Sequence, residues 1–301
     1  MKVAVSGSSG LVGSALVPHL TVGGHQVVRL VRSRAARRGE IAWNPDAGTI
    51  DTAALEGFGA IIHLAGESIA DGRWTEAKKN RIRDSRVGST RHLAAAIAGL
   101  SRPPQVLVCA SAIGYYGDRG DEPLKEDSPP GDGFLAGVCR AWEGAAEAAA
   151  RKGVRVAHHR FGMILSPAGG ALAKMLLPYR LGAGGPIGTG RQYVSWITLD
   201  DVLGAIGHAL ATVTLRGPVN TVSPHPVTNR ELARALGRVL HRPAVLPMPA
   251  FAARLVFGEM ADALLLSSQR VEPARLLASG YRFLHPDLEP ALRHLLDRVA
   301  S

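Results

Sequence analysis

A glycine-rich turn near the start of the chain constrains the fold more than any other feature. This turn, residues 7–13, follows the apolar segment 2–6, which is typical of a buried strand. It precedes the segment 14–20, which is typical of a helix. In a strand–turn–helix unit, glycines at this spacing permit the tight turn, close approach of a pyrophosphate and close packing of helix on strand. The alternative is a glycine-rich loop without a ligand. We predict that the turn binds a dinucleotide through Gly7, Ser8, Ser9, Gly10, Leu11, Val12 and Gly13.

The end of the second expected strand, Gln26–Val31, indicates which dinucleotide is bound. Arg32 follows this strand directly, about 20 residues beyond the glycine turn, where the fold meets the adenosine ribose. An acidic residue there would bind the 2′-hydroxyl of NAD, whereas an arginine accommodates the 2′-phosphate of NADP. Arg34 adds a second cation, and the first acidic residue after the turn is Glu40. We therefore predict NADP(H) as the cofactor.

Apolar strands alternate with helical segments along most of the chain. The further expected strands are 60–66, 105–111, 154–161, 193–197 and 218–222, and the long helical segments are 75–100, with a break near Gly88, and 133–151. This alternation predicts an α/β fold with a Rossmann-like, doubly wound parallel sheet and a smaller α/β C-terminal substrate domain. We expect residues 1–165, with about 191–223, to form the NADP-binding domain, and residues 166–190 and 224–301 to form the smaller substrate or cap domain.

Polar and small residues follow three of these strands, where the carboxyl ends of parallel strands face a ligand. The expected contacts to the cofactor are Leu64, Ala65, Gly66, Glu67 and Arg160, and the catalytic candidates are Ser111, Tyr115 and Tyr116. Several alternatives stay open. Glu67 could be a surface acid, Arg160 could pair with an internal acid instead of an anionic ligand, and the tyrosines could serve packing or ribose contact.

Composition and charge exclude several classes of protein. The net charge is +10, but the arginines are scattered and no nucleic-acid-binding signature is present, so we expect no nucleic-acid partner. No apolar run approaches the length of a membrane span, and the first strand begins at once, so we expect a cytoplasmic protein without a membrane partner. Cys109 and Cys139 lack metal-type spacing, and His158 and His159 point to opposite faces of a strand, so we expect no metal.

The chain resembles the extended short-chain dehydrogenases/reductases, the superfamily of the nucleotide-sugar epimerases. The glycine turn, the segment 63–66 and Ser111 followed by Tyr116-Gly117 carry this likeness. Leu64-Ala65-Gly66-Glu67-Ser68-Ile69 with Arg73-Trp74, together with segments 114–117, 184–190 and 195–197, are similar to an atypical epimerase-family subgroup, often called cell-division-inhibitor-like, whose C-terminal domain is uncharacterised. The likeness covers essentially the whole chain.

The resemblance also exposes a departure at the expected catalytic residues. Members of the wider family use a Tyr-x-x-x-Lys pair, in which tyrosine exchanges the proton and lysine lowers its pKa and holds the ribose. With Glu143 set against a family acid, the tyrosine place holds Leu135 and the lysine place holds Cys139. The usual acid–base contribution, about 10²–10⁴-fold, is therefore absent from its usual place.

Two functions fit these observations. The first is an NADP(H)-dependent epimerase or oxidoreductase that acts on a hydroxyl or carbonyl substrate, for which an anionic nucleotide sugar is one candidate. The second is a catalytically weak or inactive regulatory protein that binds NADP(H). The sequence specifies neither the substrate nor the oligomeric state.

Overall fold

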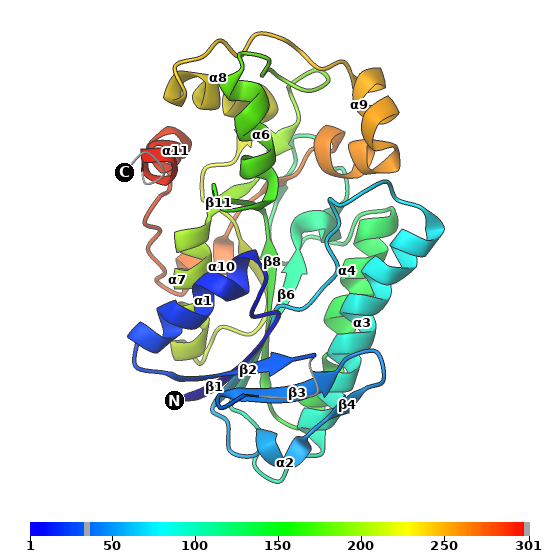
Figure 1. The fold of residues 1–301 in the computed structure, drawn as a ribbon, viewed down its shortest axis with the longest axis vertical. Helices are drawn as coiled ribbons and strands as arrows, with labels where there is room; N and C mark the ends of the chain where they lie inside the picture. The colour runs from blue at the N-terminus through cyan, green and yellow to red at the C-terminus, as the bar shows by residue number, and fades with distance from the viewer. Residues whose placement is uncertain (33–36, 298–301) are drawn as a thin grey trace.

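The computed structural model of this chain describes residues 1–32 and 37–297, so Arg34 lies outside the described residues. Its main feature is a twisted sheet at the lower end of Figure 1. The sheet strands are β1 (Lys2–Ser6), β2 (Gln26–Val31), β3 (Glu40–Asn44), β4 (Thr49–Ile50), β5 (Ala60–His63), β6 (Val106–Ala112), β8 (Arg155–Phe161) and β12 (Gly217–Thr221). Their spatial order is β12-β8-β6-β5-β1-β2-β3-β4. Neighbouring strands pair in parallel except β3 and β4, which are antiparallel.

Helices cover both faces of this sheet. The helical segments of this part of the chain are α1 (Leu11–Val22), α2 (Thr52–Leu55), α3 (Glu76–Ala98), α4 (Phe134–Gly144), α5 (Glu147–Arg151), α7 (Leu199–Ala211) and the 3₁₀ turn η1 (Ile113–Tyr116). The arrangement confirms the predicted doubly wound, Rossmann-like fold.

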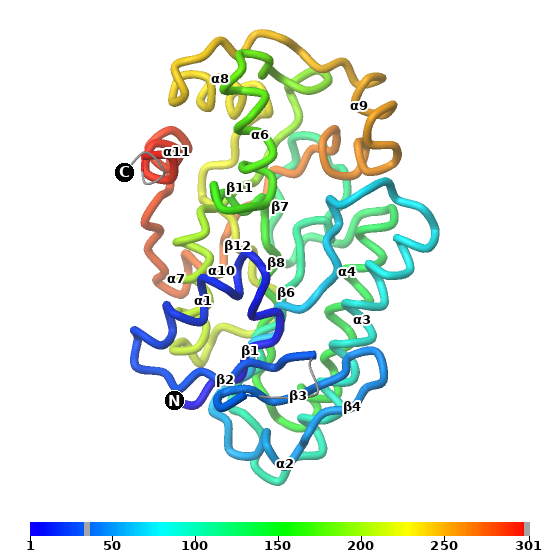
Figure 2. The backbone as a smooth tube through the Cα atoms, in the orientation of Figure 1, coloured from blue at the N-terminus to red at the C-terminus, as the bar shows by residue number. Residues whose placement is uncertain are grey.

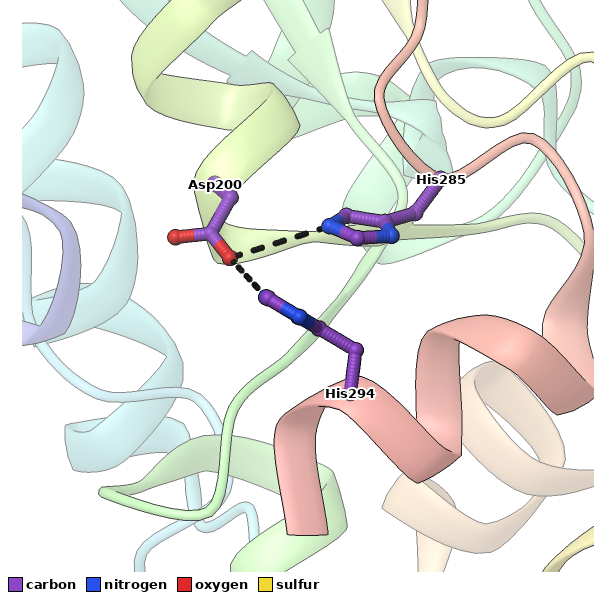
Figure 3. A group of neighbouring side chains, drawn as sticks. All are labelled: Asp200, His285 and His294. Carbon is purple, nitrogen blue, oxygen red and sulfur yellow. Dashed lines mark hydrogen bonds and ion pairs between the residues drawn. The ribbon is translucent and has the colours of Figure 1, made fainter. Parts of the chain in front are cut away.

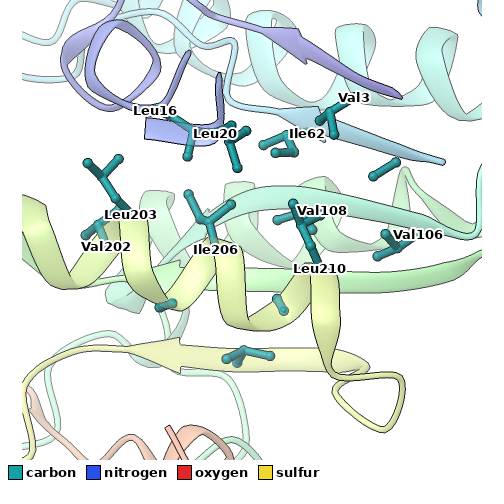
Figure 4. Packing of buried hydrophobic residues seen from close by; sticks show 14 of the residues in the cluster. Val3, Leu16, Leu20, Ile62, Val106, Val108, Val202, Leu203, Ile206 and Leu210 are labelled. Carbon is teal, nitrogen blue, oxygen red and sulfur yellow. The ribbon is translucent and has the colours of Figure 1, made fainter. Parts of the chain in front are cut away.

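The alternation of side chains along the strands builds a separate core on each face. Val3, Ile62 and Val108 point to one face and pack with α1 and α7, as the labelled side chains of Figure 4 show. Ala4 and Ile61, which neighbour Val3 and Ile62 along their strands, point to the other face and pack with α3 and α5. Both faces of the central strands are therefore buried, which explains their continuous apolar runs.

The C-terminal half adds a second group of elements, which lies at the upper end of the tube in Figure 2. Its helices are α6 (Gly170–Arg180), α8 (Asn229–Val239), α9 (Ala250–Phe257), α11 (Leu288–Asp297) and the π-helical segment η2 (Ala261–Leu266). Helix α10 (Ala274–Ala278) also follows in sequence, but it packs on β12 and contributes Leu276 to the core of the main sheet. In the described part of the chain, six short strands lie outside the main sheet, and the first of them, β7, belongs to the earlier part of the chain. They are β7 (Pro123–Leu124), β9 (Met163–Leu165), β10 (Tyr193–Val194), β11 (Trp196–Thr198), β13 (Val227–Thr228) and β14 (Arg270–Val271).

This second group has its own core, which contains apolar residues of α6, α8 and α11 around the wholly buried Trp196. A separate core supports the predicted division into two domains, which stays a prediction. Strand β14 pairs in parallel with β7, so the chain returns to the first group of elements after α9.

Several predicted elements differ in detail from the structure. Helix α3 runs unbroken through Gly88, because a glycine inside a long helix costs only about 1 kcal/mol relative to alanine. The segment 133–151 forms two helices instead of one, and the segment 193–197 forms two short strands that meet at Ser195. Strands β3 and β4 were not predicted. Among the described residues, no helix combines the length and the apolar character needed to cross a membrane.

Candidate functional site

The glycine turn has the backbone geometry that a dinucleotide phosphate requires. Gly7 has a φ of +66°, and a Cβ atom there would lie 2.7 Å from the carbonyl carbon of Leu64. A Cβ atom on Gly13 would lie 2.2 Å from the carbonyl oxygen of Gly7. Helix α1 begins after Gly10, which offers no side-chain cap for the amides of the first turn. These amides and the bare backbone around them form a cradle for an anion, and this cradle fits a pyrophosphate.

The strand register brings the other predicted cofactor residues to the same edge of the sheet. Ser6, the last residue of β1, pairs with Leu30 of β2 on one side and with His63 of β5 on the other. Arg32 lies two residues beyond Leu30, at the carboxyl end of β2. Strands β2, β1, β5 and β6 are consecutive neighbours, so the ends of β2 and β6 are about 14 Å apart across the sheet. This width suits an extended dinucleotide.

Ser111 and Arg160 pair directly across β6 and β8 and belong to a buried polar network. The guanidinium of Arg160, a residue that is 2% exposed, donates to both carboxylate oxygens of Glu143 at 2.8 Å each. Ser111 Oγ donates to Glu143 Oε1 at 2.7 Å. Tyr116, also wholly buried, donates its hydroxyl proton to Asn220 Oδ1 at 2.6 Å and accepts from Arg160 Nη1 at 2.9 Å. Of the two interpretations of Arg160, the geometry favours pairing with an internal acid.

Burial limits the chemistry of this network. Desolvation raises the pKa of Tyr116 to about 12, although Arg160 and Asn220 act in the opposite direction. For Arg160, burial acts to lower the pKa, but the hydrogen bonds and charges of Glu143 and Tyr116 outweigh it and raise the pKa above its ordinary value. Tyr116 and Arg160 therefore keep their protons near neutral pH, and the network holds the end of β6 in place.

Tyr115 differs from the other catalytic candidates because it is only partly buried. Its ring lies under the guanidinium of Arg160, with 3.5 Å between the guanidinium carbon and the ring centroid. The backbone carbonyl of Tyr115 accepts a hydrogen bond from the amide of Gly131, which fixes the turn after β6. Tyr115 thus combines a polar hydroxyl, a cation beside its ring and a place at the carboxyl end of the sheet.

The places where the wider family has tyrosine and lysine carry no polar replacement. Leu135 lies in the first turn of α4, and its Cβ is a close neighbour of Gly114. Cys139 lies one turn further along α4 and is buried. Burial, reinforced by the negative charge of Glu143, raises the pKa of the Cys139 thiol to about 12, so it is neutral at physiological pH.

The segment after β5 contacts two cations of α3, Lys78 and Arg86, that sequence reasoning missed. Glu67, a predicted cofactor contact, accepts from Lys78 Nζ at 2.7 Å, and this bond holds the pKa of Glu67 below its ordinary value. Arg86 lies against Gly66, because a Cβ atom on that glycine would be 3.3 Å from the guanidinium carbon. Arg86 also stacks on the ring of Trp142, at 5.1 Å from the ring centroid.

Arg86 brings a positive charge close to the place where the wider family has its lysine. Its charge acts on Cys139 and Glu67, and it is partly buried, so desolvation lowers its pKa from the ordinary arginine value. The position of Arg86 in the sequence does not indicate that it belongs to the site, because its approach to Cys139 depends on how α3 packs against α4.

Comparison with protein-family models gives two matches. The model described as the NAD dependent epimerase/dehydratase family matches residues 3–222, which include the glycine turn and the polar network. A second model, described as a domain of unknown function (DUF1731), matches residues 248–295.

Individual proteins and solved structures are similar over nearly the whole chain. Epimerase family protein Mb2239 of Mycobacterium bovis is 44% identical over 296 residues, which cover 98% of each chain. The crystal structure of the human epimerase family protein SDR39U1 with NADPH is 36% identical, with a TM-score of 0.90 and 99% of each chain covered. The structure of MoeE5 in complex with UDP-glucose and NAD is 20% identical, with a TM-score of 0.75 over the full length of both chains, and shows likeness of fold alone.

Proposed function

This chain belongs to the NAD dependent epimerase/dehydratase family, and we propose that it binds NADP(H) and uses it to oxidise and reduce a hydroxyl or carbonyl substrate. The observation that carries the proposal is the glycine cradle, in which Gly7 and Gly13 leave no room for a side chain. Arg32, at the end of β2, supports the phosphorylated cofactor over NAD(H). The human relative SDR39U1, whose structure was determined with NADPH, supports the same choice.

In this proposal the amides of the first turn of α1 bind the pyrophosphate, and Arg32 binds the 2′-phosphate. When bound, NADP(H) supplies or takes up the hydride. Tyr115 then exchanges a proton with the substrate oxygen, because it is the most accessible of the three catalytic candidates. The guanidinium of Arg160 packs against the face of the Tyr115 ring and fixes its position. The carboxylate of Glu143 accepts the hydroxyl proton of Ser111 and so orients that hydroxyl. We propose that Arg86 supplies part of the positive charge that a lysine supplies in the wider family.

The proposed substrate is a small molecule that bears a hydroxyl or carbonyl group, and a nucleotide sugar is the first class to test. The proposed compartment is the cytoplasm, without nucleic-acid or membrane partners. A second candidate function, regulation by NADP(H) binding without turnover, is favoured by Leu135 and Cys139 at the family's catalytic places. It is also favoured by the burial of Ser111 and Tyr116 in a network that uses their hydroxyl groups.

Replacement of Arg32 by glutamate tests the cofactor assignment. We expect Arg32→Glu to raise the Kd for NADPH at least about tenfold and to leave the Kd for NADH within about twofold, because only NADPH has the 2′-phosphate. Fluorescence titration of both cofactors measures this. Lys152→Glu is the charge-matched control, since this exposed lysine precedes β8, three strands away from β1 in the sheet. Equal losses for NADPH and NADH would contradict the phosphate contact.

Replacement of Tyr115 by phenylalanine tests the catalytic assignment. We expect Tyr115→Phe to lower kcat by about 10²–10⁴-fold, because it removes the proton donor and keeps the ring under Arg160. The measurement is NADPH oxidation, or deuterium uptake from solvent, across a panel of nucleotide sugars and carbonyl compounds. Wild-type turnover in the variant would remove Tyr115 from the mechanism. No turnover across the panel by wild-type protein that binds NADPH would favour the regulatory function.

A further inference from the structure

Three side chains of kinds that can bind metal ions, from separate segments, lie together where α7 begins, as Figure 3 shows. Asp200 lies in the first turn of α7, His285 lies in the segment between α10 and α11, and His294 lies in α11. Asp200 Oδ2 is 2.9 Å from His294 Nε2 and 4.0 Å from His285 Nε2. We propose that this cluster, referred to below as the Asp–His–His cluster, is a Zn²⁺ site that joins α7 to α11.

The donor atoms have a spacing that suits one ion. In tetrahedral zinc sites, bonds of about 2.0–2.1 Å place neighbouring donor atoms roughly 3.4 Å apart. The two distances from Asp200, 2.9 and 4.0 Å, lie on either side of that value, and all three donor atoms lie within 4.8 Å of one another. The two imidazole rings face each other, with centroids 4.1 Å apart and an angle of 31° between their planes. Small side-chain rotations would therefore bring all three donors onto one ion.

The backbone that holds the cluster is fixed by other interactions. Asp201, the wholly buried neighbour of Asp200, accepts hydrogen bonds from the backbone amides of Leu284 and His285 at 2.7 and 3.0 Å. It also accepts from the hydroxyl of Tyr281 at 3.1 Å. These bonds tie the segment that contains His285 to the start of α7. Because the protein sets the positions of the ligands in advance, an ion need not reorganise the chain to bind.

Helix α11 fixes the third ligand independently. Its apolar face, with Leu292 and Leu295 buried, packs into the core that it shares with α8. His294 lies between these two leucines in sequence and points toward Asp200. The side chains of Asp200 and His294 are each 30% exposed and that of His285 is 18% exposed. An ion can therefore enter from solvent, and water can complete its coordination.

The donor set selects the class of metal. Two imidazole nitrogens and one carboxylate oxygen suit Zn²⁺ and neighbouring first-row ions, whereas Mg²⁺ and Ca²⁺ prefer oxygen ligands throughout. The proposal departs from the prediction that the chain binds no metal. That prediction was based only on the spacing of the cysteines and on one pair of adjacent histidines. The Asp–His–His cluster is invisible to such spacing rules, because Asp200 and His285 are far apart in sequence. Bound zinc would link α7, which packs on the main sheet, to α11 of the second core.

The test is Zn²⁺ binding to the full chain, purified without a histidine tag and freed of metal by a chelator. We expect calorimetry to show one Zn²⁺ bound per chain, and Zn²⁺ but not Mg²⁺ to raise the melting temperature. His285→Ala and His294→Ala should each weaken binding at least about 100-fold, because loss of a direct ligand should exceed the usual 10–100-fold effect of its supporting partners. His225→Ala is the matched control, since it removes a histidine from an exposed pair with Asp287, 2.8 Å away.

Three results would overturn the zinc site. They are absence of Zn²⁺ binding by the wild-type chain, equal weakening in His225→Ala, and equal melting shifts with Mg²⁺ and Zn²⁺. If either histidine variant fails to fold, X-ray absorption of the zinc-loaded wild-type protein decides the question without a substitution. Two imidazole nitrogens around the metal would support the site, and coordination without imidazole would contradict it.

Discussion

Gly13→Ala should weaken NADPH binding at least about 100-fold, or by about 2.7 kcal/mol. The added Cβ atom would lie 2.2 Å from the carbonyl oxygen of Gly7 and 2.7 Å from Cα of Ser8. Both are backbone atoms of the turn, so relief requires α1 to move away from β1 or the turn to open. Either movement takes the first-turn amides out of line with the pyrophosphate. Titration of NADPH by fluorescence or calorimetry measures the loss, with circular dichroism to verify folding.

Two further glycine variants separate loss of the cradle from loss of the fold. Gly88→Ala adds the same methyl group inside α3, where, apart from the two chain neighbours and the helix's own backbone, no atom of the described residues lies within 4 Å of it. It should retain NADPH affinity and gain about 0.5–1 kcal/mol of stability. In Gly10→Ala the nearest atom is 3.4 Å away, an ordinary contact, so this variant should fold normally but crowd the phosphate. Wild-type affinity in a folded Gly13→Ala protein would contradict the cradle.

The parts of the fold that local sequence could predict are those with local physical causes. The glycine turn was readable because glycine alone readily tolerates the positive φ of Gly7 and the contact at Gly13. The bounds of β2 follow directly from its largely apolar run, which is typical of a strand inside a parallel sheet. Strands β3 and β4 were missed because they lie at the edge of the sheet. Their short, mixed segments depend on pairing with β2 and with each other.

The side-chain partnerships of the site depend on packing that spacing alone does not reveal. Ser111 and Arg160 meet because β6 and β8 pair in one particular register. Glu143 reaches both because α4 packs beside that pair of strands. Sequence reasoning offered an internal acid as one partner for Arg160, but it could not identify which acid. Arg86 was missed for a related reason, since it approaches Gly66 from a different element, α3.

Glu143→Ala should lower the free energy of unfolding by about 3–5 kcal/mol, the usual cost of removing one partner from a buried ion pair. The carboxylate accepts two bonds from Arg160 and one from Ser111. Without it, the guanidinium of Arg160 stays buried with its charge uncompensated. Among the described residues, its other hydrogen-bond partners are the hydroxyl of Tyr116 and the backbone carbonyl of Glu126, both of which are uncharged. Urea denaturation at neutral pH measures the change.

A double-mutant cycle separates the interaction energy between Glu143 and Arg160 from the effect of changing the size and packing of their side chains. In Glu143→Leu with Arg160→Met, both charges are replaced by apolar side chains, so no buried charge lacks a partner. The double variant should therefore be more stable than the sum of the two single substitutions predicts, by at least about 1 kcal/mol. The exposed pair of Glu147 and Arg151 is the control, since its loss should cost less than about 1 kcal/mol. If the changes in unfolding free energy of the two single variants add up to that of the double variant, Glu143 and Arg160 stabilise the protein independently. That result would contradict the idea that the network acts as a unit to hold the end of β6.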